Sequence, residues 1–86
     1  GNTVVAKPSE VTPATATMLG RLCGEIGFPS GALNIVHGLG PEVGEALVTA
    51  PAIRAVSFTG STAVGTRIAT LCAERLRRVS LELGGK

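Results

Sequence analysis

Aromatic residues are nearly absent from this sequence, which has no Trp, no Tyr and only 2 Phe among its 86 residues. Charged residues are also scarce, at 16%, whereas hydrophobic residues reach 44%. Surfaces that bind nucleic acid commonly interleave basic side chains with aromatic rings that stack on bases. The basic cluster Arg75, Arg77 and Arg78 lacks such rings. We therefore expect it to be a solvated helix end, and we expect no nucleic-acid partner.

Long apolar runs are also missing, since none approaches the roughly 18 residues that a membrane-crossing helix needs. The N-terminus has neither a charged leader nor an apolar signal core. We expect a soluble, cytoplasmic protein with no membrane partner. Cys23 and Cys72 lie far apart in apolar helical patterns, without the spacing of a metal or redox pair, so we expect buried structural thiols and no metal site.

The small size of the chain limits the core that it can form. A domain of this length buries only about 60 to 65% of the surface that its unfolded chain exposes. The sequence begins with Gly1 rather than Met and stops at Lys86, inside a pattern typical of a strand entering a loop. We therefore expect residues 1–86 to be a fragment of a larger domain.

Short apolar runs alternate with stretches of helical period and predict four strands separated by three helices. The strands are expected at 3–6, 33–36, 54–58 and 79–83. Thr12 is expected to cap the first helix, Pro41 to open the second and Ser61 to cap the third. This order predicts an α/β fold, a parallel β-sheet with crossover helices that is Rossmann-like (β-α-β-α-β-α-β).

In such a sheet every strand enters its following loop at the same edge, which is where open α/β sheets bind ligands. We therefore expect the segments 7–10, 37–41, 59–61 and 82–86 to converge there. Lys7 and Glu10 could bond to the two hydroxyls of a ribose, and the alternative is an exposed ion pair. Glu82 ends a strand between two leucines, and partial burial would make its carboxylate a better general base, although a hydrated strand tip is equally compatible.

Two glycine-containing turns could also contact a ligand. Residues 38–44 resemble a dinucleotide fingerprint with the third glycine displaced by one position, and a tight turn without a ligand is the alternative. Thr59, Gly60 and Ser61 lead into a helix N-terminus, where free amides favour a phosphate. Ser61 there is also an ordinary N-cap, and the two roles are compatible.

Taken together, four stretches resemble the aldehyde dehydrogenase superfamily in order and approximate spacing. They are GNTVVAKPSE at 1–10, GLGPEVG at 38–44, SFTGSTAVG at 57–65 and LELGGK at 81–86. The resemblance implies a fragment of the cofactor-binding domain of an enzyme that oxidises an aldehyde to a carboxylic acid with NAD or NADP. It also implies a small-molecule aldehyde substrate and a parent protein that is a homo-oligomer.

The resemblance assigns Glu82 as the general base that activates water. It implies cofactor contacts at Lys7, Pro8, Ser9, Glu10, Gly40, Pro41, Gly44, Phe58, Thr59, Gly60, Ser61, Val64, Leu83 and Gly84. The nucleophilic cysteine of the family does not match Cys23 or Cys72, so residues 1–86 alone are expected to be inactive. Because Glu10 would repel the extra phosphate of NADP, NAD is the expected cofactor and NADP is less favoured.

A different class of protein remains open from the residues alone, namely a free-standing, non-catalytic nucleotide-binding or interaction module. A start codon directly before Gly1 and a stop codon after Lys86 would favour it. In either case, uncovered strand edges favour self-association or partial disorder of the isolated chain.

Overall fold

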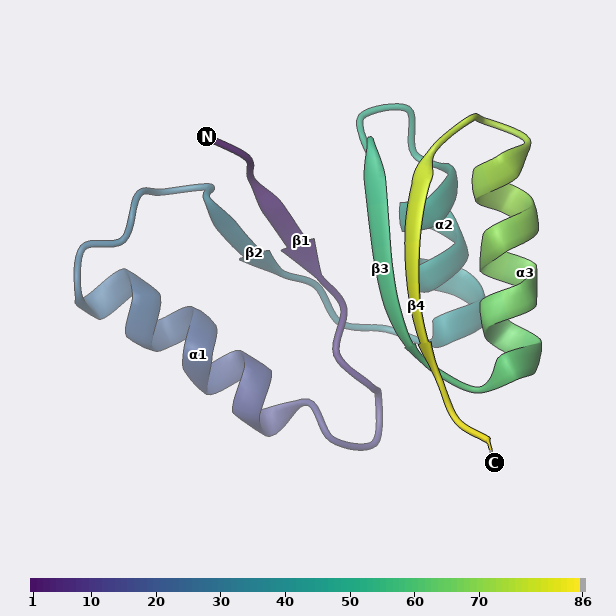
Figure 1. Cartoon of the computed structure of the whole chain (residues 1–86). Coiled ribbons are helices and arrows are strands. Elements are labelled where there is room, and N and C mark those ends of the chain that lie inside the picture. Colours follow the sequence, from purple (N-terminus) through teal and green to yellow (C-terminus); the bar gives the residue numbers. More distant parts are fainter. Residues whose placement is uncertain (86) are drawn as a thin grey trace. The chain divides into compact units, whose positions relative to one another are not determined.

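The computed structural model describes residues 1–85, in which strands and helices alternate (Figure 1). The elements are β1 (Val4–Ala6), α1 (Ala14–Glu25), β2 (Leu33–Ile35), a π-helical turn (Gly40–Gly44), α2 (Glu45–Thr49), β3 (Ala55–Gly60), α3 (Thr62–Ala73) and β4 (Arg78–Leu83). The predicted α/β order is confirmed. The chain divides into two compact units, Gly1–Gly44 and the residues from Glu45 onward.

Each unit contains one parallel strand pair. In the first unit β1 pairs with β2, with Val4 opposite Leu33. In the second unit β3 pairs with β4 over their whole length, from Ala55 opposite Arg78 to Gly60 opposite Leu83. We expected one sheet, but the strands within residues 1–85 form two hydrogen-bonded pairs, because periodicity identifies strands without identifying their lateral neighbours.

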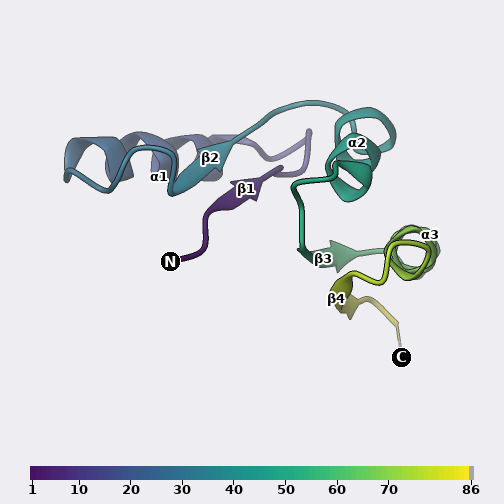
Figure 2. The ribbon, with the colours of Figure 1, turned by 90° about the horizontal axis from the view of Figure 1, so that it is seen from above.

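In the first unit, helix α1 lies alongside the β1–β2 pair and contacts β2 (Figure 2). Gly20 permits this approach, because a Cβ there would lie 2.9 Å from Ile35 Cγ1. The prediction that Thr12 caps α1 is wrong. The N-cap is Pro13, without a side-chain cap, and the Thr12 amide instead donates to Ser9 O at 3.2 Å. A Ser9–Thr12 turn therefore replaces the expected cap.

The second helix differs most from the expectation. Pro41 lies inside the π-helical turn rather than opening an α-helix, and α2 has only 5 residues. Proline has no amide hydrogen to donate, so the first regular helical bonds form beyond it. Pro51 follows the end of α2, as expected.

The core of the second unit consists of Val48, Leu71 and Cys72, with Val56 and Ile68 packed against it. Cys72 is completely buried, as predicted, whereas Cys23 in the first unit is only partly buried. Helix α3 packs on both β3 and β4.

Helix α3 begins as the sequence predicted. The Ser61 hydroxyl accepts a hydrogen bond from the Val64 amide at 3.3 Å. Gly65 is buried in the first turns of α3, where a Cβ would lie 2.5 Å from Leu83 Cδ2. The small residue therefore lets α3 approach the end of β4.

The arginine cluster is not simply a solvated helix end. Arg75, which follows α3, donates to Leu71 O in the last turn of that helix at 3.1 Å. Arg77 is half-buried and donates to the last carbonyls of α2, those of Val48, Thr49 and Ala50. It thus caps the C-terminus of α2, where a cation also favours the helix dipole.

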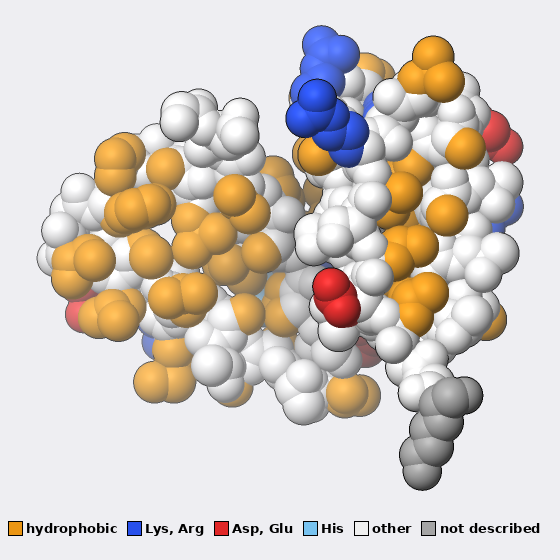
Figure 3. Space-filling model, viewed as in Figure 1, with side chains coloured by type: hydrophobic (Ala, Val, Ile, Leu, Met, Phe, Trp, Pro, Cys, Tyr) orange, Lys and Arg blue, Asp and Glu red, His pale blue; other side chains and the backbone are white. Residues whose placement is uncertain are grey.

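Many large apolar side chains remain open to solvent in both units, and they form much of the surface in Figure 3. On α1 they include Met18, Leu19 and Leu22, each more than half exposed. Within residues 1–85, no helix combines the length and apolar character that a membrane crossing requires.

Candidate functional site

The carboxyl end of β1 is organised around Lys7, whose side chain is only 13% exposed. Its ammonium donates to Pro8 O at 2.6 Å, to Gly38 O at 3.0 Å and to Glu10 Oε2 at 3.3 Å. The Gly38 contact joins two segments that are 31 residues apart in the sequence. Lys7 therefore ties the loop after β1 to the turn after β2.

Glu10 is exposed and pairs with Lys7. Hydrogen bonds from its own backbone amide and from Lys7 lower the pKa of this carboxyl below 4.5. Both donors favour the charged form, so Glu10 presents a stable negative charge at the end of β1. The expected ion pair exists, and it leaves Glu10 accessible to a ligand.

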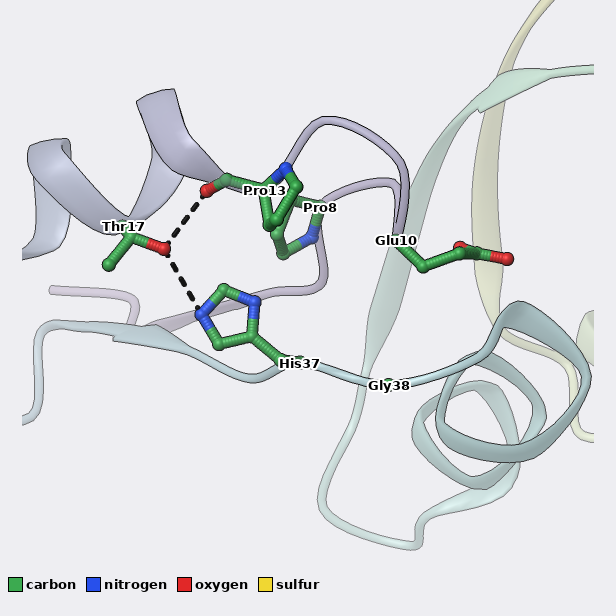
Figure 4. Close-up of a pocket in the computed structure, with 6 residues that line it drawn as sticks. All are labelled: Pro8, Glu10, Pro13, Thr17, His37 and Gly38. Atoms are coloured by element: carbon green, nitrogen blue, oxygen red, sulfur yellow. Dashed lines mark hydrogen bonds between the residues drawn. The ribbon is translucent and has the colours of Figure 1, made fainter.

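A pocket of about 280 Å³ lies next to this ion pair (Figure 4). Its lining includes Pro8, Glu10 and His37, which lie in segments that the sequence placed at the ligand edge, and Thr17, which the sequence did not place there. The Thr17 hydroxyl donates to Pro13 O at 2.9 Å and contacts His37 Nε2 at 3.2 Å. Because a hydroxyl has one proton, this arrangement requires a proton on His37 Nε2. Glu10 points away from this group in Figure 4.

The sequence included His37 only as the first residue of the segment 37–41 and gave it no role of its own. Thr17 gave no signal of its own, because a threonine inside a helix is commonly bonded to the carbonyl one turn earlier.

Of the glycines in the turn at 38–44, one is required by the backbone and by packing, and the other two are not. Gly38 has φ +146°, and a Cβ there would lie 2.3 Å from Val43 Cγ2, so the fold itself requires glycine. A Cβ at Gly40 would meet nothing within 4 Å, and one at Gly44 would only touch Lys7 Cε at 4.0 Å. Internal packing therefore leaves open space beside Gly40 and Gly44.

In the second unit, the ends of β3 and β4 are tied to the start of α3. The Gly84 amide donates to Gly60 O at 3.2 Å, which extends the strand pairing past β4. The Thr62 hydroxyl donates to Gly84 O at 3.3 Å. Gly60 itself lies against the Phe58 ring, where a Cβ would come within 2.5 Å of Cζ. This edge thus brings together residues 58–62 and 82–84.

Glu82 lies opposite Thr59 in the β3–β4 register, so the two side chains share one face of the pair. Both are exposed. The sequence left partial burial and a hydrated strand tip equally open for Glu82. Among residues 1–85 it is a hydrated strand tip, because α3 packs on the opposite face, where Phe58 and Leu81 are partly buried.

The other predicted residues lie at these same two edges. Ser9 closes the turn after β1, where its hydroxyl accepts from the Val11 amide at 3.4 Å. Pro41 is exposed in the π-helical turn, and Val64 is 48% exposed in the first turn of α3. Leu83 ends β4 and is 38% exposed. In residues 1–85, no group of three or more His, Cys, Asp or Glu side chains could hold a metal ion.

The residues of these two edges lie at the ends of parallel strands that alternate with helices, which is the arrangement of an α/β fold. Residues 1–86 match the model of the aldehyde dehydrogenase family. The chain is 53% identical over 85 residues to the mitochondrial succinate-semialdehyde dehydrogenase of Arabidopsis thaliana, covering 99% of this chain and 16% of that protein. It is 55% identical over 86 residues to human 2-aminomuconic semialdehyde dehydrogenase, covering 100% of this chain and 18% of that protein.

Solved structures give the same result. An NAD-dependent aldehyde dehydrogenase from Sinorhizobium meliloti superposes with a TM-score of 0.94 at 46% identity, over 98% of this chain and 17% of that one. PnpE, solved in complex with nicotinamide adenine dinucleotide, has the same TM-score and identity over 100% of this chain and 18% of that one. The chain belongs to the aldehyde dehydrogenase family.

The chain spans less than a fifth of the length of these relatives. The name of the Arabidopsis relative places that enzyme in mitochondria, so family membership alone gives no support to the cytoplasmic location that we expected.

Proposed function

We propose that this chain is the part of an NAD-dependent aldehyde dehydrogenase that binds the cofactor and supplies the general base, Glu82. The parent enzyme would oxidise an aldehyde to a carboxylic acid. The observation that carries the proposal is the edge of the β3–β4 pair. There Glu82 is an exposed carboxylate beside Thr59, next to the N-terminus of a 12-residue helix.

The residues fit NAD on two grounds of chemistry. The first amides of α3 precede those that Ser61 engages, so they are free to donate to a pyrophosphate, and the helix dipole favours the negative charge. Gly40 and Gly44 leave space where side chains would otherwise stand, as an approaching adenine ring needs. Neither feature is required by packing within the described residues.

Lys7 and Glu10 would hold the adenosine ribose through its hydroxyl groups. A carboxylate accepts hydrogen bonds from hydroxyls, but it repels a phosphate on the same ribose. Since the pKa of Glu10 is lowered, this charge persists at neutral pH. The proposal therefore includes a preference for NAD over NADP.

The remaining proposed contacts are assigned by position. Pro8 and Ser9 follow β1 beside Lys7, and Pro41 lies between the two open glycines. At the other edge the proposed contacts are Phe58, Thr59, Gly60, Ser61, Val64, Leu83 and Gly84.

NAD, when bound, supplies the acceptor for the hydride of the aldehyde. In the parent enzyme, the nucleophilic cysteine would hold the oxidised substrate as a thioester. The role of Glu82 would be to take a proton from water, so that the water oxygen bonds to the acyl carbon, the carbon–sulfur bond breaks and the cysteine leaves as a thiolate. Cys72 is completely buried in the core and cannot reach a substrate, which agrees with a nucleophilic cysteine outside residues 1–86. The exposed position of Glu82 gives water access to its carboxylate.

The test is Glu82→Gln in the full-length protein that carries this chain. An amide cannot accept the proton of the water, so we expect acyl release to slow by about 10²- to 10⁴-fold while NAD affinity is unchanged. Rapid-mixing measurements of NADH formation would show an initial burst followed by slow turnover. Glu74→Gln, at an exposed carboxylate after α3, is the matched control. Unchanged turnover in the Glu82 variant would remove it from the mechanism.

A further inference from the structure

We propose that Lys7 is a positioning residue that holds the turn at 38–44 in its shape before any ligand binds. In the same proposal, Glu10 accepts one hydrogen bond from the Lys7 ammonium in the ligand-free protein, and a ribose hydroxyl replaces Glu10 as the acceptor when the ligand binds. The second half of this proposal rests on the proposed function. The first half concerns the ligand-free protein and is independent of it.

The argument starts from the donors of Lys7. A lysine ammonium has three N–H donors and no acceptor. In this structure three acceptors surround Lys7, namely Pro8 O, Gly38 O and Glu10 Oε2. No donor is left over for a ligand, so a ribose hydroxyl must displace one acceptor. The contact to Glu10 is the longest of the three, at 3.3 Å, and it reaches the most exposed group. It is therefore the one to be exchanged.

The contacts to the carbonyls are of a different kind. Lys7 donates to Gly38 O at the start of the turn. One side chain from the loop after β1 thus holds the first carbonyl of the turn. Gly38 has a positive φ, and Val43 occupies the space beside it. Holding the Gly38 carbonyl fixes the direction in which the chain enters the turn.

The first backbone bonds of the turn end next to Gly38. The amides of Glu42 and Val43 both donate to Leu39 O, at 3.2 Å and 2.9 Å. Leu39 follows Gly38 directly, so both bonds depend on the direction in which the chain enters the turn. The link from Lys7 to Gly38 therefore supports these two bonds.

The first test measures amide hydrogen exchange in the ligand-free, full-length protein. In Lys7→Met, which keeps the apolar stem but has no ammonium, we expect exchange at Glu42 and Val43 to accelerate by about tenfold, as for the loss of a charge-assisted hydrogen bond. Glu10→Gln keeps both carbonyl contacts of Lys7 and should leave exchange at these amides unchanged. Equal exchange in Lys7→Met and the unmodified protein would overturn the positioning role.

The Val36 amide, which donates to Ala6 O at 3.0 Å, reports whether the β1–β2 pair is intact. If Lys7→Met also loses protection there, Lys7→Leu is measured in its place, since it fills part of the same space and has no donor for Gly38 O. Acceleration at Val43 with Val36 protected supports the proposal, and protection at both sites refutes it.

The second test separates positioning from contact with the ribose. A nicotinamide dinucleotide lacking the hydroxyls of its adenosine ribose cannot bond to Lys7 through them. We expect Lys7→Met to weaken the binding of both ligands, because the displaced turn affects both. On a logarithmic scale, the increase in the Kd of the analogue should be at least half the increase in the Kd of NAD. An unchanged affinity for the analogue would mean that Lys7 acts only through the ribose. If the unmodified protein binds neither ligand, the proposed function fails and the exchange test still decides the positioning role.

Discussion

Replacement of Arg77 by alanine should loosen the end of α2 more than its surface position suggests. The guanidinium donates to the carbonyls of Val48, Thr49 at 3.4 Å and Ala50 at 2.8 Å, while Val48 is 5% exposed and belongs to the core. In Arg77→Ala the carbonyls of Val48 and Thr49, at the negative end of the helix dipole, lose this charged donor, whereas the Ala50 carbonyl keeps its bond from the Ile53 amide at 3.1 Å.

A hydrogen bond from a charged donor contributes about 1.5 to 3 kcal/mol, and the favourable position at a helix C-terminus about 0.3 to 1 kcal/mol. The site is only half-buried and the 3.4 Å contact is long, so solvent offsets part of the sum. We expect a loss of about 2 kcal/mol in the free energy of opening α2, which corresponds to about thirtyfold faster exchange of the Ala50 amide.

Arg78→Ala is the matched control, because the neighbouring side chain makes no hydrogen bond or ion pair in the part of the chain that the structure describes. Its effect should stay within about 0.5 kcal/mol, or about twofold in exchange. The measurement is amide exchange resolved by peptide in the full-length protein. Equal exchange of the Ala50 amide in the two variants would refute the capping role of Arg77.

Three further predictions follow from the edges of the strand pairs. Because the pKa of Glu10 is lowered, its ion pair with Lys7 should be complete above about pH 4.5 and should be lost as the pH falls through the lower pKa of the folded state. A carbon NMR titration of the Glu10 carboxyl should show this, and in Lys7→Met the pKa should rise toward 4.5. Gly44→Val should weaken NAD binding by tenfold or more with little change in thermal stability, whereas a large stability loss with unchanged NAD affinity would contradict the open space proposed there. Ser61→Ala should cost about 1 kcal/mol as a lost N-cap, read as faster exchange of the Val64 amide.

Much of the fold followed from local chemistry. Ser61 behaves as predicted because a hydroxyl before a helical stretch has one nearby amide to accept from, whatever surrounds it. Parallel pairing followed from the alternation of strands and helices. Thr12 does not cap α1, because the N-cap position falls one residue later, at Pro13, whose side chain has no acceptor.

The site was predictable in its positions but not in its contacts. The spacing of Lys7 and Glu10 indicated an ion pair, yet nothing in the sequence linked Lys7 to Gly38, a contact between segments far apart in the chain. Arg77 was missed for the same reason, since its partners lie more than 25 residues earlier. The exposure of Glu82 also depends on which face α3 covers, which periodicity alone does not determine.

Because the thiol of Cys72 is completely buried, its rate of reaction with a reagent in solution reports how often the second unit opens. A reagent that alkylates thiols can reach that sulfur only when the core around Val48, Leu71 and Cys72 opens, whereas the partly exposed Cys23 reacts without such an event. The ratio of the two labelling rates, measured by mass spectrometry at increasing temperature or denaturant concentration, would show how often the second unit opens.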